Sequence, residues 1–228
     1  MEEQTYPVLD LGLIRLVDFM GGDDAVVQAA RVSLGRGLTH DERDKKLVFF
    51  LLANGHETPF EHAIFKFHIK CPIFVARQWF RHRIASYNEI SGRYTEMKEE
   101  FYLPKNLRTQ KARNYQYEDV IEPLNHELLD KIATGYEAAF KLYQELLASG
   151  VAKEHARIIL PLSLYTQFYW TINSRSLMNF LHLRMEEHAQ FEIRQYAEII
   201  SAIFKEKMPW SHEAFERFII LGEKWTEL

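Results

Sequence analysis

The sequence has one cysteine, no long apolar run and no excess of positive charge. Because Cys71 is the sole cysteine, an internal disulfide framework and a zinc site built from several cysteines are both excluded. No stretch reaches the roughly 18 consecutive apolar residues typical of a membrane helix. The first ten residues are acidic and lack the apolar segment of a signal peptide. We therefore expect a cytoplasmic protein without a membrane segment.

The charge balance argues against a polyanionic partner. Lysine and arginine together number 28, against 32 acidic residues, which gives a formal net charge of −4. Broad binding to nucleic acid or to an anionic membrane surface needs an extended basic face. We expect neither a nucleic acid nor a membrane as a partner.

The apolar pattern predicts an α+β protein in which helices follow a few strands. With 228 residues, 47% of them hydrophobic, and no repeat or linker, the chain is expected to form one domain over residues 1–228. Alternating or β-rich segments predict strands at 11–20, 65–71 and 162–172. Helical spacing and capping signals predict helices at 25–32, 40–53, 118–149, 153–160, 173–187, 188–207 and 211–220, and one that starts after Pro72. We expect irregular chain after the helix that starts beyond Pro72, and an exposed loop over 94–113.

The segment 77–93 holds four arginines, one histidine and a single acid, Glu89. Guanidinium groups placed close together repel one another unless an anion or a carboxylate lies among them. A phosphorylated small molecule would satisfy them through bidentate contacts. The alternative is a surface cluster of ion pairs with Glu96, Glu99 and Glu100, which would contribute little to stability. Composition alone leaves both interpretations open.

The motif Arg-His-Arg, followed after seven residues by Ser, runs from Arg81 to Ser91. Other distinctive segments are HETPFEH at 56–62, ARIILP at 156–161, NSRSLMNF at 173–180, LR at 183–184 and HAQ at 188–190. In their order and spacing they resemble the flavin-dependent thymidylate synthases over most of the chain. The resemblance thins between about residues 97 and 151.

This resemblance implies a small, mainly antiparallel sheet with a cluster of helices, assembled as a homotetramer with active sites between subunits. The implied reaction is the reductive methylation of dUMP to dTMP. Its carbon donor is 5,10-methylenetetrahydrofolate, and FAD reduced by NADPH carries the hydride. The family needs no cysteine nucleophile. Cys71 agrees with this, because it falls on the apolar phase of the strand at 65–71, which favours a buried, inert thiol.

The resemblance also implies a set of site residues. Arg184 is the implied catalytic residue, because a guanidinium beside the uracil would stabilise an ionised N3. His56 is implied to face the flavin and the folate. The residues implied to bind dUMP are Gln78, Arg81, Glu89, Ser91, Gly92, Arg93, Arg157 and Arg184. The residues implied to bind FAD are Thr58, Arg81, His82, Arg83, Glu89, Asn173, Arg175, Asn179 and His188.

Three other interpretations compete with this one. Histidines and acids at 56–62 and 182–188 could suggest a metal site, but their spacing matches no standard ligand set, so no metal is expected. A non-catalytic nucleotide-binding module would not need the motif at 173–180. A folate- and flavin-dependent uracil methyltransferase acting on RNA would need a basic surface that the net charge of −4 does not favour.

Overall fold

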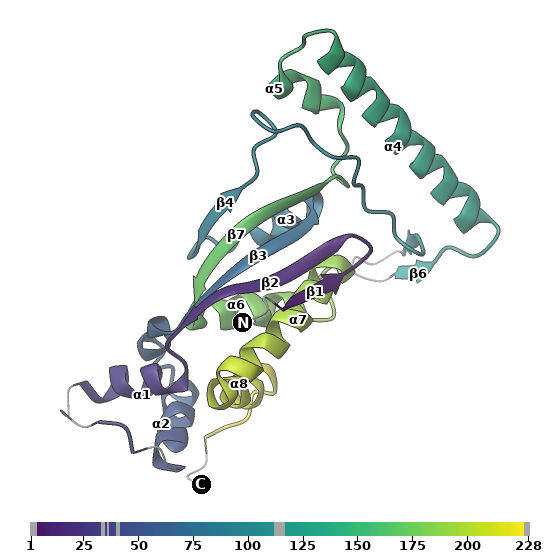
Figure 1. Cartoon of the computed structure of the whole chain (residues 1–228). Coiled ribbons are helices and arrows are strands. Elements are labelled where there is room, and N and C mark those ends of the chain that lie inside the picture. Colours follow the sequence, from purple (N-terminus) through teal and green to yellow (C-terminus); the bar gives the residue numbers. More distant parts are fainter. Residues whose placement is uncertain (1–3, 33–34, 36, 40–41, 112–116, 226–228) are drawn as a thin grey trace.

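The computed structural model describes residues 4–32, 35, 37–39, 42–111 and 117–225. Its centre is a five-stranded sheet with the strand order β1-β2-β3-β7-β4, in which every pairing is antiparallel (Figure 1). The strands are β1 (Thr5–Val8), β2 (Gly12–Met20), β3 (Ile64–Pro72), β4 (Ser86–Glu89) and β7 (Tyr165–Asn173). A separate two-stranded hairpin pairs β5 (Arg108–Gln110) with β6 (Tyr117–Asp119). The α+β class is therefore confirmed.

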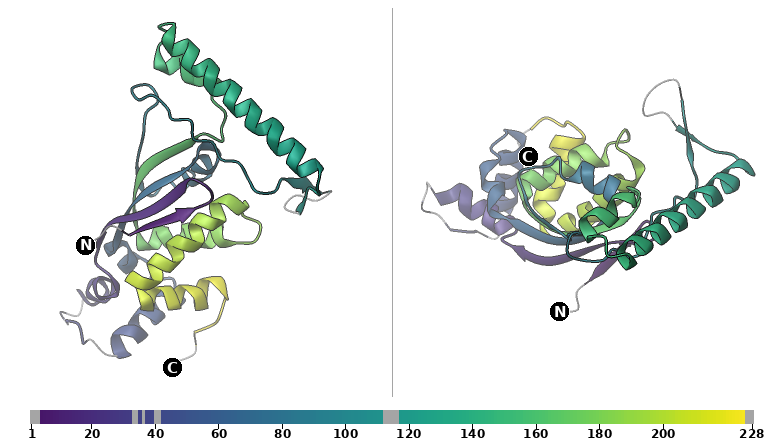
Figure 2. Two further views of the ribbon diagram at one scale, coloured as in Figure 1. Left: turned by 45° about the vertical axis from the view of Figure 1, so that its right-hand side comes forward. Right: turned by 90° about the horizontal axis from the view of Figure 1, so that it is seen from above.

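Helices cover one face of the sheet and extend beyond its lower end. The α-helices are α1 (Asp23–Arg31), α2 (Glu42–Ala53), α3 (Ile73–Trp79), α4 (Leu124–Ala148), α5 (Lys153–Ala156), α6 (Ser174–Met185), α7 (Phe191–Lys207) and α8 (Pro209–Phe215). Shorter turns of helix are η2 (Thr58–His62), η3 (Arg157–Ile159) and η4 (Glu216–Ile220). Figure 2 shows the sheet curving around the helices that pack on it, while α4 extends away from this body. None of the helices in the described ranges has the length and apolarity needed to cross a membrane.

The alternation along the two central strands explains which face the helices cover. In β3, Phe65, Phe67 and Ile69 are fully buried, whereas the intervening side chains are partly or fully exposed. In β7, Phe168 and Trp170 are buried in the same way. Since successive side chains of a strand point to opposite faces, one face of the sheet supplies the core and the other stays open.

The predicted strands at 11–20, 65–71 and 162–172 are confirmed as β2, β3 and β7. Strands β1 and β4 were not foreseen, and the irregular chain expected after α3 is wrong where β4 pairs with β7. The helix expected over 118–149 begins only at Leu124, and the loop expected over 94–113 contains β5. The expected helix start at His40 and the end of that loop at 112–113 lie outside the described residues.

A second, smaller apolar cluster lies apart from the main core. Phe140 and Tyr143 of α4 are buried against Ala156 of α5, and Met97 and Phe101 pack against this cluster. Helix α4 also contacts η3, and Asn125 of α4 accepts from the Leu107 amide, so this helix and its neighbours form an arm on the sheet. The single domain over 1–228 stays a prediction.

Gly12, at the start of β2, is required by close packing against α7. The Tyr196 hydroxyl, buried in α7, donates a hydrogen bond of 2.8 Å to the Lys70 carbonyl oxygen. A Cβ on Gly12 would lie 2.0 Å from that hydroxyl and 2.6 Å from the Val8 carbonyl oxygen. The absence of a side chain at Gly12 therefore allows the hydrogen bond between helix and sheet.

We expect Gly12→Ala to lower the free energy of unfolding by about 2 kcal/mol, because overpacking would displace the Tyr196 hydroxyl. Gly135→Ala is the matched control, since an added Cβ there meets nothing within 4 Å. In the helix interior it should raise stability by about 0.5–1 kcal/mol. Urea unfolding of both variants measures the difference; equal stabilities would contradict the packing argument.

Candidate active site

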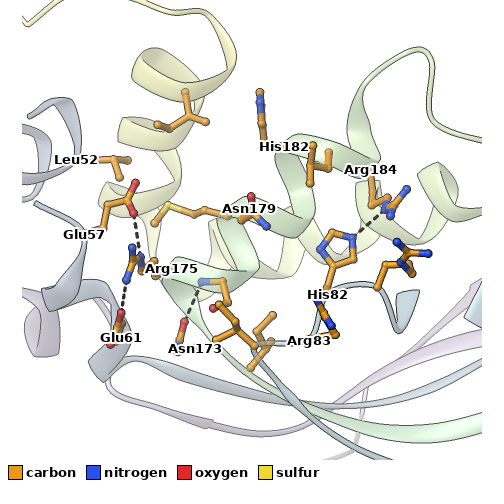
Figure 3. Close-up of a pocket in the computed structure, with 17 residues that line it drawn as sticks. Leu52, Glu57, Glu61, His82, Arg83, Asn173, Arg175, Asn179, His182 and Arg184 are labelled. Atoms are coloured by element: carbon orange, nitrogen blue, oxygen red, sulfur yellow. Dashed lines mark hydrogen bonds and ion pairs between the residues drawn. The ribbon is translucent and has the colours of Figure 1, made fainter. Parts of the chain in front are cut away.

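A cavity of about 690 Å³ lies between α6, the η2 turn and the segment that follows α3 (Figure 3). Its walls carry arginines from both halves of the chain. The lining residues are Leu52, Glu57, Glu61, Arg81, His82, Arg83, Ile84, Ile172, Asn173, Arg175, Ser176, Met178, Asn179, His182, Leu183, Arg184 and Ile219. Four guanidinium groups facing two carboxylates leave an excess of positive charge around this cavity.

The Arg-His-Arg turn is held in place by the strand that follows it. Helix α3 ends at Trp79, and residues 81–85 lead into β4. From β4, the Tyr87 hydroxyl donates to the His82 carbonyl oxygen at 2.7 Å and lies 3.3 Å from the Trp79 carbonyl oxygen. Burial raises the pKa of Tyr87 to about 12, so this hydroxyl remains a donor at physiological pH. The backbone of the turn is thereby fixed.

The opposite wall is the beginning of α6. The Asn173 side chain caps the helix by accepting from the Ser176 amide at 2.8 Å. The Ser174 hydroxyl, fully buried, donates to the Phe60 carbonyl oxygen at 2.5 Å, and its amide donates to the Ala63 carbonyl oxygen at 2.8 Å. These bonds fix η2 against the N-terminus of α6, where the helix dipole favours an anion.

Arg175 of α6 is held by acids of the η2 segment. Its Nε donates to Glu57 Oε2 at 2.9 Å and its Nη1 to Glu61 Oε1 at 2.5 Å (Figure 3). These hydrogen bonds raise the pKa of Arg175, so it stays charged. The sequence suggests Glu57 and Glu61 only as possible metal ligands. The described residues contain no group of three or more histidines, cysteines or acids placed to hold a metal ion.

Arg184 and His82 meet at the other end of the cavity. Arg184 Nε donates to His82 Nε2 at 2.9 Å (Figure 3). Arg184 Nη2 donates to the Gln78 carbonyl oxygen at 3.3 Å. Burial and the positive charge of Arg184 lower the pKa of His82 to about 4. His82 is therefore a neutral acceptor at physiological pH. Burial and the nearby Arg81 also lower the pKa of Arg184 from its ordinary value.

A second cavity, of about 420 Å³, lies on the far side of Arg184. It shares Leu183 and Arg184 with the first cavity, and its lining also includes Gln78, Tyr117, Glu186, His188, Ala189 and Gln190. The Gln78 amide nitrogen donates to the Gln190 side-chain oxygen within this wall. Arg184 therefore stands between two adjoining cavities.

The implied dUMP residues fall into two groups. Gln78, Arg81 and Arg184 line the two cavities. The second group, which consists of Glu89, Ser91, Gly92, Arg93 and Arg157, lies at the far end of β4. There a Cβ on Gly92 would be 3.2 Å from Arg157 Cδ, and Arg93 Nε lies 3.3 Å from Glu154 Oε2.

The register of the sheet separates these two groups. Glu89 pairs with Phe168 on β7, and its carboxylate accepts from the Thr166 hydroxyl at 2.6 Å. Asn173, at the first cavity, lies five residues further along the same strand. At about 3.3 Å per residue, the two ends are roughly 17 Å apart. One chain does not bring all the implied dUMP residues together.

Most of the implied FAD residues do come together. Arg81, His82, Arg83, Asn173, Arg175 and Asn179 line the first cavity, and His188 lines the second. Thr58, Glu89 and His56 line neither. Thr58 begins η2, and the exposed His56 ring meets the edge of Phe50 with centroids 5.8 Å apart. The roles assigned to all these residues stay predictions.

Comparison with known proteins gives a consistent result. The family model described as "Thymidylate synthase complementing protein" matches residues 15–210. The chain is 57% identical over 222 residues to a flavin-dependent thymidylate synthase of Thermosipho africanus, covering 96% of each chain. It is 53% identical to the one of Thermotoga neapolitana, covering 97% of this chain and 99% of the relative. A solved UMP/dUMP methylase of Streptomyces cacaoi, bound with 5-Br UMP, superposes with a TM-score of 0.83 at 38% identity, covering 91% of this chain and 94% of the other.

The contact between His82 and Arg184 predicts a dependence of stability on pH. The pKa of His82 lies at about 4 in the folded chain, below its ordinary value of 6.5. Between these values the unfolded chain binds a proton that the folded chain does not, so stability should fall as the pH falls from about 6.5 to about 4. We expect His82→Gln to flatten this part of the profile, measured by urea unfolding from pH 4 to pH 7.5.

His182→Gln is the matched control, because it removes another histidine from the lining of the same cavity. A His82→Gln profile as steep as that of the control would contradict the origin assigned to the pH dependence.

Proposed function

The chain belongs to the family of flavin-dependent thymidylate synthases, and from this premise we propose that it converts dUMP to dTMP. The carbon would come from 5,10-methylenetetrahydrofolate, and FAD, reduced by NADPH, would supply the hydride to the uracil ring. The observation that carries this proposal is the first cavity. There Arg81, His82 and Arg83 face the N-terminus of α6 and adjoin Arg184.

The cavity suits a dinucleotide with a pyrophosphate. Neither Arg81 nor Arg83 makes an ion pair with any residue that the structure describes, so both guanidinium groups are available to an anion. The capped N-terminus of α6 adds favourable potential for a phosphate. Ile84 and Leu183, both exposed, provide apolar surface for a flat ring. We assign FAD to this cavity, with Arg81, His82, Arg83, Asn173, Arg175 and Asn179 as its ligands.

Arg184 is placed to act on the uracil beside the flavin. His82 and the Gln78 carbonyl oxygen orient its guanidinium from one side, which leaves further N–H donors free for a substrate. Stabilising the N3-ionised form of uracil would raise the electron density of the ring where the new carbon bond forms. Gln78, on the second cavity, would contact the same base.

No thiol takes part in this proposal. Cys71 is fully buried in β3, and burial raises the pKa of its thiol well above the ordinary range. A thiol that is shielded from solvent and protonated is a poor nucleophile. This supports hydride transfer from the flavin in place of covalent activation by cysteine.

The division of the dUMP residues supports an assembly in which neighbouring chains complete each site. The group at the far end of β4, with Ser91, Arg93 and Arg157, contains the donors suited to a nucleotide phosphate. One copy would present this group to the cavities of another, with Arg184 on the receiving chain. A homotetramer would supply four such sites with closed symmetry.

The first test is reconstitution with FAD followed by an assay with dUMP, 5,10-methylenetetrahydrofolate and NADPH. We expect flavin absorbance in the purified complex and formation of dTMP. UMP is assayed in parallel, because the solved neighbour is named as a methylase of both nucleotides. Arg184→Ala should retain FAD and lose at least about a hundredfold in kcat, as expected for loss of one charge-stabilising donor. Cys71→Ala is the matched control and should keep its activity.

An enzyme that binds no flavin or forms no dTMP would refute the proposed function. Near-normal turnover by Arg184→Ala would refute only the role of that residue.

The shared site is tested by mixing two inactive variants. Arg184→Ala and Arg157→Ala each remove a residue from a different group, so each alone should be inactive. If one chain supplies Arg184 and another supplies Arg157, about a quarter of the sites in randomly mixed assemblies should contain both residues and be active. Co-expressed variants that stay as inactive as their parents would show that each site is built within one chain.

A further inference from the structure

A third cavity continues the groove beyond Arg184. Its volume is about 410 Å³, and it shares Tyr117 and Gln190 with the second cavity. The second cavity in turn shares Leu183 and Arg184 with the first. The three cavities therefore adjoin one another in series, from the Arg-His-Arg turn to the hairpin of β5 and β6. None of the roles assigned above uses the third cavity.

Arg108 of the hairpin, which lines this cavity, forms an ion pair with Glu192 of α7. Arg108 of β5 donates from Nη2 to Glu192 Oε1 at 2.7 Å, and the Arg108 side chain remains 30% exposed. Its guanidinium lies 5.7 Å from the ring centroids of both Tyr117 and Phe191. The hairpin strands are otherwise exposed, so these contacts hold Arg108 in the lining of the cavity.

Glu192 is an unusual residue to find beneath a surface hairpin. It is 2% exposed, and its Oε1 also accepts from the Tyr102 hydroxyl at 3.2 Å. Its Oε2 is buried and has no hydrogen-bond partner within the described chain. A buried carboxylate with one unsatisfied oxygen costs stability. The Glu192 carboxylate holds one edge of the Arg108 guanidinium, and the other N–H donors of that guanidinium stay available.

The rest of the lining defines what this cavity can bind. Asn106, Gln110 and Gln190 bring side-chain amides, Tyr117 brings a ring, and Pro104 and Leu107 bring apolar surface. This lining suits a ligand in which a flat ring is joined through an amide to an anionic end. Because Glu192 already offsets part of the charge on Arg108, a carboxylate fits better than a doubly charged phosphate.

We propose that the third cavity binds the aminobenzoyl-glutamate arm of the folate co-substrate, with Arg108 pairing with a glutamate carboxylate. This inference rests on the proposed function. The reacting end of the folate would lie near Arg184, and the second cavity would lead its arm towards the hairpin. Arg108 is then a binding residue for the carbon donor, remote from the atoms that react.

The test uses the FAD-loaded enzyme and three variants. Arg108→Gln removes the cation, Glu192→Gln removes the buried charge, and Arg194→Gln is the matched control. Arg194 also lies on α7, where its Nε is 3.9 Å from Glu198 Oε1, but it does not line the cavity. The readouts are KM for 5,10-methylenetetrahydrofolate, KM for dUMP, KM for NADPH, and FAD content.

We expect Arg108→Gln to raise KM for the folate about tenfold or more, as for loss of a charged hydrogen bond. The KM values for dUMP and NADPH and the FAD content should stay at the wild-type level. Glu192→Gln should leave KM for the folate unchanged or lower it, because Arg108 would keep its full charge. A purely structural role for the ion pair predicts the opposite, namely that both variants raise the same KM.

Three outcomes would overturn the inference. These are an unchanged folate KM in Arg108→Gln, equal increases in Arg108→Gln and Glu192→Gln, and an increase confined to KM for NADPH, which would assign the cavity to the reductant.

Direct binding of N-(4-aminobenzoyl)-L-glutamate to the wild type and to Arg108→Gln separates this inference from the proposed function. A wild type that binds this fragment through Arg108 but forms no dTMP would refute the proposed function alone. A wild type that forms dTMP but binds the fragment no better than Arg108→Gln does would refute the inference alone.

Discussion

The antiparallel pairing of β4 with β7 determines where the arginines on either side of β4, namely Arg81, Arg83 and Arg93, lie. Ser86 pairs with Thr171 and Glu89 with Phe168, so the two ends of β4 point to opposite ends of the strand that leads into α6. The Arg-His-Arg turn is thereby placed beside Asn173, and Ser91 and Arg93 are carried towards α5. The register of this one pairing thus separates the Arg-His-Arg turn from the second group of polar and basic residues at the far end of β4.

The balance of charge around the first cavity depends on which groups are neutral. Arg175 is paired with Glu57 and Glu61, whereas Arg81 and Arg83 have no carboxylate partner among the described residues. Burial and the charge of Arg184 lower the pKa of His82 to about 4, so the neutral ring can accept a hydrogen bond among several cations. A protonated His82 would instead repel Arg184 and leave its Nε without an acceptor. The motif therefore combines two cations with one neutral acceptor that orients a third.

Local patterns in the sequence predicted the parts of the fold that local chemistry decides. The alternation over 65–71 is a property of neighbouring residues, and the strand there was predicted correctly. Strand β4 was missed because Ser86–Glu89 is short and polar, and it is a strand only through its pairing with β7. The contact of His82 with Arg184 spans 102 positions, and the pairing of Arg175 with Glu57 spans 118. No spacing rule reports such contacts; the family resemblance named these residues but not their arrangement.

The burial of Cys71 has a practical consequence for experiments on this protein. Its thiol is 0% exposed within the central sheet, and its raised pKa keeps it protonated. Alkylating reagents and oxidants react with thiolates that they can reach, so the folded chain offers them no native target. A cysteine introduced on the hairpin or along α4 would then be the one reactive thiol per chain. The wild-type sequence already provides a silent background for site-specific fluorescent or spin labels.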